Sequence, residues 1–187
     1  EESSPRNVSR ETSADIIAHE PGLRYVAVSR RTSGYGELVQ PGIHAVQVHA
    51  PYQGSLEAER SLVERVRAEI GEDVELWRAV SMTSGAGVEV ALGIRGGVDK
   101  LVLDARDGGS GETFRWADIP DEVRGDSLLA GGLHPDNLAD ALAVGCSGVD
   151  LNSGIEYPAQ AGRKDAGALR RAFEIIGNYH YPRTEND

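Results

Sequence analysis

The sequence predicts an α/β fold built on a parallel β-sheet. The main evidence is a series of short runs rich in apolar and β-branched residues. Several of these runs are separated by segments whose apolar residues recur with the period of a helix. The runs cover residues 24–29, 44–50, 74–80, 100–104, 127–132 and 147–154. Most are continuously apolar instead of alternating with polar residues, which indicates strands buried on both faces. An open doubly wound sheet and a (β/α)₈ barrel both fit, although no GxGxxG follows the first run, which counts against a dinucleotide-binding sheet.

Length, charge and cysteine content exclude several classes of protein. A chain of 187 residues with 40% hydrophobic and 26% charged residues suits one globular domain. Its net charge of −11 opposes the phosphate backbone of nucleic acids and argues against nucleic-acid binding. One cysteine excludes a disulfide framework and favours a cytoplasmic protein. No run approaches the roughly 20 apolar residues of a membrane span, so no membrane partner is expected.

The clearest helix is predicted over residues 55–71, where Gly71 supplies a stop. The acidic residues of this helix, such as Glu57, are expected to face solvent. Between the first two strands, glycines and a proline leave room for barely a turn or two of helix. The apolar stripe of the 55–71 helix consists of Leu56, Leu62, Val63, Val66 and Ile70.

Two further helices are predicted near the C-terminal end. Residues 136–145 begin with Asp136 or Asn137 as a cap, and residues 165–179 begin with Asp165 as a cap. Cys146 follows the first of these helices and is expected to be a small buried hydrophobe.

Polar and glycine residues gather directly after the predicted strands. Because parallel strands bring their carboxyl ends to one edge of the sheet, this pattern predicts a functional face there. Glycines in the last two loops would let backbone N–H groups approach a phosphate without a Cβ in the way. Either loop alone could be a simple tight turn, but together they favour phosphate binding. The residues concerned are His49, Asp104, Gly131, Gly132, Asp150, Asn152, Ser153 and Gly154.

Several segments resemble phosphoribosylanthranilate isomerase, an enzyme family of tryptophan biosynthesis. The likeness covers nearly the whole chain; it is strong from about residue 98 onward and weaker between residues 20 and 97. The segments similar to the last three strand and loop units are LVLDARDGGSGETFRW, LLAGGLHPDN and VDLNSGIEYPAQAGRKD. SPRNVS resembles the segment that follows the second strand, and AVQVHA resembles the VQLHG motif of the fourth strand.

The resemblance implies a (β/α)₈ TIM barrel that catalyses an Amadori rearrangement without a metal or an organic cofactor. Its substrate would be a phosphorylated sugar joined to anthranilate. Asp104 matches the family's general acid, which protonates the furanose ring oxygen as the ring opens. Partial desolvation at a barrel rim lets a carboxyl group carry such a proton near neutral pH.

Other roles carry over in the same way. Arg6 would bind the anthranilate carboxylate, and Asp150 would lie close to the sugar or to the second catalytic group. Gln47 and His49 share one face of a strand near the site, and one of them could simply fill the barrel. The phosphate would be bound by Gly108, Gly109, Ser110 and Gly111 of a mobile loop, and by Gly131, Gly132, Ser153 and Gly154.

The chain departs from the family at its start. The family's general base is a cysteine in a KICG-type motif on the first strand, and this motif is absent here. We therefore expect residues 1–187 to form a single barrel domain that is N-terminally incomplete and lacks the first strand, the first helix and the second strand. Three explanations are open: a preceding part of the natural protein, a second chain or a homodimer that completes the barrel, or a diverged paralogue.

Three functions follow from these observations. The leading prediction is isomerisation of N-(5′-phosphoribosyl)anthranilate. The alternative is a catalytically inactive, phosphosugar-binding paralogue that serves as a binding partner. In a third version, a related enzyme acts on another ribosyl amine, with His49 or Asp150 as the base.

Overall fold

The computed structural model describes residues 6–83, 85–104 and 115–179. Within these residues, six parallel strands form one sheet, and their order in space follows their order in the chain. All six predicted strands are present, although the last contains only two residues. They are β1 (Tyr25–Ser29), β2 (Ile43–Val48), β3 (Glu75–Ser81), β4 (Lys100–Asp104), β5 (Ser127–Ala130) and β6 (Gly148–Val149).

The strand order distinguishes between the two predicted architectures. A doubly wound sheet reverses its strand order at a switch point, whereas a barrel wall adds each strand beside the previous one. Here each strand pairs with its neighbour in the sequence, so the sheet is part of a barrel wall. Among the described residues, β1 and β6 pair on one side only. The prediction of a (β/α) barrel with missing units is confirmed.

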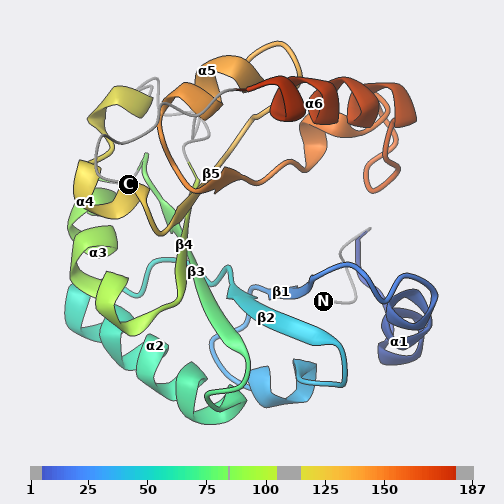
Figure 1. The fold of residues 1–187 in the computed structure, drawn as a ribbon. Helices are drawn as coiled ribbons and strands as arrows, with labels where there is room; N and C mark the ends of the chain where they lie inside the picture. Colours follow the sequence, from blue (N-terminus) through green and yellow to red (C-terminus); the bar gives the residue numbers. More distant parts are fainter. Residues whose placement is uncertain (1–5, 84, 105–114, 180–187) are drawn as a thin grey trace, which may run out of the picture.

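The helices lie on the outer side of this curved sheet (Figure 1). The predicted short connection between β1 and β2 contains only a 3₁₀ turn, Tyr35–Leu38. No helix in the described part of the chain is both long and apolar enough to cross a membrane. The helices are α1 (Arg10–His19), α2 (Leu56–Ile70), α3 (Gly87–Ile94), α4 (Asp121–Arg124), α5 (Leu138–Ala143) and α6 (Ala166–Asn178).

Local capping explains where the two best-predicted helices begin and end. Ser55 Oγ accepts a hydrogen bond from the Ala58 N–H at 3.1 Å, and α2 ends at Gly71, which has a φ of 75°. Asp165 Oδ1 accepts from the N–H groups of Gly167 and Ala168, which satisfies donors that the first turn of α6 leaves free. The predicted Asp165 cap is confirmed.

Two apolar layers lie on opposite faces of the sheet. The larger one fills the space between the strands and the outer helices, and includes Leu76, Leu101 and Leu129. The smaller one lies inside the barrel and consists of Ala79, Val102 and Ala130, packed against Trp77 and Leu128. Because side chains alternate along a strand, Asp104 shares the barrel-facing side with Val102.

A buried ion pair joins α2 to β3. The Arg78 guanidinium lies 3.0 Å from the Glu59 carboxylate, and the two side chains are 2% and 0% exposed. The expectation that the acidic residues of this helix face solvent is therefore wrong for Glu59, although Glu57 is exposed. Glu59 can be buried because an arginine from the neighbouring strand neutralises its charge.

We expect removal of one partner of this pair to lower the free energy of unfolding much more than removal of both partners. Arg78→Met leaves a buried carboxylate without its counter-charge and should lower the free energy of unfolding by about 3–5 kcal/mol. The double variant Glu59→Met/Arg78→Met leaves no buried charge and should cost clearly less. Urea unfolding of the purified protein measures both values.

Arg115→Met is the matched control, because it breaks an ion pair with Asp118 whose side chains are 77% and 45% exposed. It should cost less than about 1 kcal/mol. A double variant as unstable as Arg78→Met would contradict this account of the buried pair.

Candidate active site

Three titratable side chains meet at the carboxyl end of the sheet. His49 Nε2 lies 3.9 Å from Asp104 Oδ2, and the side chain of Gln47 hydrogen-bonds to Asp150. Asp150 also interacts electrostatically with both His49 and Asp104. The structure thus brings together four of the residues that the sequence predicted for the site.

Strand pairing continues just beyond the strands and fixes the backbone at each of these positions. The N–H of His49 donates to the Ser29 carbonyl at 2.7 Å, and the N–H of Asp150 donates to the Leu129 carbonyl at 2.8 Å. The Asp104 carbonyl accepts from the Met82 N–H at 2.9 Å. The side chains therefore project from a rigid rim instead of from free loops.

Burial shifts the proton affinities of two of these groups. Desolvation lowers the pKa of His49 below its usual 6.5, and the nearby Asp104 carboxylate only partly opposes this effect. Desolvation also raises the pKa of Asp150, against the hydrogen bond from Gln47 and the charge of His49. The lowered pKa favours the neutral form of the imidazole, which can accept a hydrogen bond.

A cavity of about 180 Å³ opens beside His49 and Asp104. Its lining includes Arg30, directly after β1, and Tyr52, which is 46% exposed. Neither residue was predicted from the sequence. An arginine directly after the first strand was a signal that could have been used, since the other site residues also follow strands.

The two loops predicted to bind phosphate pack directly against each other. A Cβ placed on Gly154 would overlap the carbonyl oxygen of Leu133, in the loop after β5. In that loop, Gly131 and Gly132 have φ values of 93° and 64°, a region that favours glycine. The loops therefore form one continuous surface, while their phosphate role remains a prediction.

Asn137 stands at the N-cap position of α5, one of the two positions predicted, but its side chain makes no capping hydrogen bond to that helix. Instead, Asn137 Oδ1 accepts from the His134 N–H at 2.9 Å, and Nδ2 donates to the Gly132 carbonyl at 3.2 Å. Asp136 lies 3.7 Å from the imidazole of His134. Asn137 thus closes the loop after β5 on itself, which no local sequence pattern indicates.

Arg6 holds a carboxylate of the chain itself. Its Nε and Nη2 donate to the two oxygens of Glu156 at 3.0 and 2.6 Å, in a bidentate pair. Lys164 Nζ donates to the same carboxylate at 3.0 Å and to Asn152 Oδ1 at 2.9 Å. The pair links residues 150 positions apart and fastens the N-terminal segment to the loop after β6.

Other predicted residues fall outside this arrangement. Gly108, Gly109, Ser110 and Gly111 lie outside the described residues. Cys146 is 5% exposed, and burial raises the pKa of its thiol to about 11, so it is the inert hydrophobe that the sequence predicted. Within residues 6–83, 85–104 and 115–179, no three His, Cys, Asp or Glu side chains are grouped closely enough to hold a metal ion.

A partial (β/α) barrel with polar side chains at the carboxyl ends of its strands has the architecture of barrel enzymes, which frequently bind phosphate with the loops after their last strands. The sequence profile of one such family, N-(5′-phosphoribosyl)anthranilate (PRA) isomerase, matches residues 1–175. The chain belongs to the PRA isomerase family, as its motifs predicted.

Curated relatives support this assignment. The chain is 62% identical over 185 residues to the tryptophan biosynthesis protein TrpCF of Corynebacterium glutamicum, a match that covers 97% of the chain and 39% of the relative. The Salmonella typhi TrpCF protein is 36% identical over 183 residues, covering 95% of the chain and 37% of the relative. The chain therefore spans about two fifths of the length of these relatives.

Solved structures agree with the barrel assignment. A PRA isomerase in complex with reduced 1-(o-carboxyphenylamino)-1-deoxyribulose 5-phosphate superimposes with a TM-score of 0.69 at 25% identity, covering 95% of this chain and 84% of the other. The PRA isomerase of Thermotoga maritima gives a TM-score of 0.70 at 27% identity, with coverages of 95% and 85%.

We expect Gly154→Ala to destabilise the protein by about 1–3 kcal/mol, because the added methyl group forces apart two packed backbones. Thermal or urea unfolding measures the change. Gly177→Ala is the matched control, since nothing lies within 4 Å of a Cβ at this position in α6. Its effect should be neutral or slightly stabilising. Equal stability of both variants would show that the two loops do not constrain each other.

The Glu156 carboxylate should contribute to acid stability. The hydrogen bonds from Arg6 are the main reason why its pKa falls from 4.5 to about 2, against a smaller opposing effect of desolvation. A pKa lowered by folding stabilises the protein above pH 4.5, and this contribution is lost as the pH falls toward about 2. Glu156→Gln should thus be less stable than the natural protein at pH 7, by an amount that shrinks over this range.

Unfolding measured between pH 7 and pH 2 tests this expectation. Glu57→Gln, which removes an exposed carboxylate from α2, is the control. A stability difference between Glu156→Gln and the natural protein that does not change with pH would rule out the proposed linkage.

Proposed function

We propose that the protein containing this chain converts N-(5′-phosphoribosyl)anthranilate to the corresponding carboxyphenylamino-deoxyribulose phosphate. The observation that carries the proposal is the position of Asp104, the residue that matches the family's general acid. It ends β4 at the rim of the barrel, and a histidine faces its carboxyl group at 3.9 Å. The family match over residues 1–175 makes this reaction the natural candidate.

In the proposed reaction, Asp104 gives a proton to the furanose ring oxygen while the bond between this oxygen and C1 breaks. The nitrogen lone pair forms a protonated imine (an iminium ion) at C1, and a base then removes the proton on C2. The resulting enol-amine tautomerises to the ketose product. Neutral His49 would hydrogen-bond to Asp104 or to a sugar hydroxyl, and Asp150 would lie at the opposite side of the sugar.

These 187 residues contain no match to the motif that carries the family's general base. The resemblance assigns this role to a cysteine on a first strand, whereas the single cysteine here, Cys146, is buried with a raised pKa. The inactive-paralogue alternative was motivated by this missing base. Identity of 62% to a curated tryptophan biosynthesis protein favours the active enzyme.

The remaining roles complete the proposal. Residues 1–187 would be part of one barrel domain, acting in the cytoplasm without a cofactor. The loops containing Gly131, Gly132, Ser153 and Gly154 would bind the substrate phosphate. Arg6 would bind the anthranilate carboxylate. This carboxylate would displace Glu156 from the guanidinium of Arg6, or share the guanidinium with it. A homodimer or a second chain that completes the barrel is a further proposal, tested by mass measurement in solution.

Asp104→Asn should lower kcat by about 10²–10⁴-fold, because an amide cannot donate the proton that the ring oxygen needs. Steady-state isomerase assays of the full-length protein measure this loss. Asp140→Asn, on the exposed side of α5, is the matched control and should retain activity. An Asp104→Asn variant as active as the natural protein would overturn the assignment of Asp104, and an inactive natural protein would overturn the isomerase proposal.

A further inference from the structure

Arg78 occupies an unusual position for a charged residue. It lies in the middle of β3, between Trp77 and Ala79, and its side chain is 2% exposed. By the alternation of the strand it faces the outer helices and not the barrel interior, where Ala79 packs. Burying a guanidinium here is costly unless its donors are satisfied.

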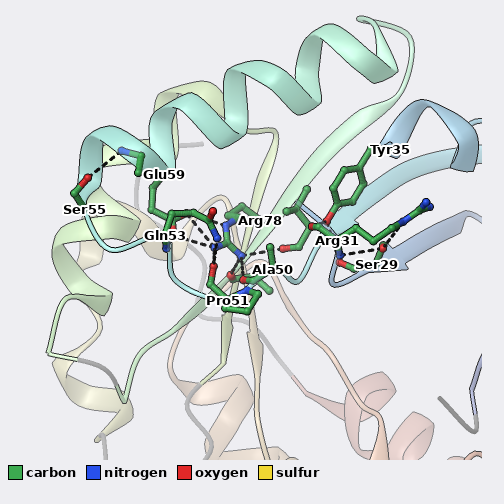
Figure 2. Close-up of polar contacts among 12 residues, drawn as sticks. Ser29, Arg31, Tyr35, Ala50, Pro51, Gln53, Ser55, Glu59 and Arg78 are labelled. Atoms are coloured by element: carbon green, nitrogen blue, oxygen red, sulfur yellow. Dashed lines mark hydrogen bonds and ion pairs between the residues drawn. The ribbon is translucent and has the colours of Figure 1, made fainter. Parts of the chain in front are cut away.

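The backbone around His49 satisfies several of these donors. Arg78 Nη1 donates to the carbonyl of Val48 at 3.2 Å and to that of Ala50 at 2.8 Å. These two carbonyls belong to the residues directly before and after His49. Figure 2 shows the guanidinium at the centre of the group, between Glu59 and the carbonyls of Ala50 and Pro51.

Glu59 holds the guanidinium in this orientation. Its two oxygens accept from Nη2 and Nε of Arg78 at 3.0 and 3.1 Å, in a bidentate pair. Glu59 Oε1 also accepts from the backbone N–H of Gln53 at 2.8 Å, farther along the same loop. The pair therefore binds the connection between β2 and α2 at both of its ends.

We propose that Arg78, oriented by Glu59, is a positioning residue that fixes the backbone on both sides of His49 so that the imidazole faces Asp104 beside the cavity. The cavity beside these residues is also lined by Arg78 and Glu59, so the pair supports its wall. The consequence for catalysis rests on the proposed isomerase function, whereas the consequence for the geometry of His49 does not.

The charges around His49 agree with this role. The positive charges of Arg30 and Arg78 lower the pKa of the imidazole, the carboxylates of Asp104 and Asp150 raise it, and desolvation is the largest effect. Releasing the loop would expose the imidazole to water, and removing Arg78 would also remove one positive charge. Both changes should move the pKa of His49 upward, toward its usual 6.5.

The test compares three variants in the full-length protein. Arg78→Met removes the guanidinium and all its hydrogen bonds. Arg78→Lys keeps the positive charge but cannot make the bidentate pair with Glu59. Glu59→Met/Arg78→Met replaces the pair by apolar side chains, in case the single Met variant does not fold. NMR titration of labelled histidine reports the pKa of His49, and steady-state kinetics report kcat and KM.

Arg67→Met is the matched control. Arg67 lies on the same helix as Glu59, bonds to two carbonyls near the start of β3 and pairs with Asp99. Its loss should destabilise the protein without changing the titration of His49 or kcat.

We expect the Met-containing variants at position 78 to raise the pKa of His49 and to lower kcat by about 10- to 100-fold, with a smaller change in KM. Arg78→Lys should give a smaller drop in kcat than the Met variants. A folded double variant with the natural titration of His49 overturns the proposal, as does an Arg67→Met variant that reproduces the effect. If the natural protein shows no isomerase activity, the titration of Arg78→Lys still decides the positioning role: this variant keeps the charge, so a raised pKa of His49 supports the role and the natural titration overturns it.

Discussion

Parallel pairing in chain order is the constraint on which the rest of the structure depends. Because each strand lies beside its predecessor and runs in the same direction, all six carboxyl ends meet at one rim. Residues from β2, β4 and the segment after β6 reach the same site only for this reason. The same pairing extends past the strands, because the backbone N–H groups of His49 and Asp150 bond to neighbouring strands. These hydrogen bonds fix the backbone positions of both residues.

Two ion pairs link different parts of the chain near this rim. Glu59 and Arg78 are buried, and they connect one outer helix to the backbone beneath His49. Arg6 and Glu156 lie nearer the surface, and they connect the N-terminal segment to the last loop. In each pair the positive charge is balanced by a carboxylate, so both pairs stabilise the rim without adding net charge to it.

Local patterns predicted much of this structure. Continuous apolar runs identified the strands, helical spacing identified α2, and Asp165 was recognisable as a cap because capping involves neighbours in the sequence. Motif likeness identified the family and brought Gln47, His49, Asp104 and Asp150 together. Contacts between residues far apart in the chain were not predictable, since no local signal indicates that Glu59 meets Arg78 or that Arg6 meets Glu156.

The contact between Gly154 and Leu133 has a consequence for how this family can vary. The backbone of Leu133 in one loop occupies the space that a side chain at position 154 in the other loop would need. A larger residue at position 154 is acceptable only if the loop after β5 takes another path, and such a shift would displace Asn137 and its hydrogen bonds. The two loops should therefore change together in evolution, and exchanging one of them between distant relatives should fail unless its partner is exchanged as well.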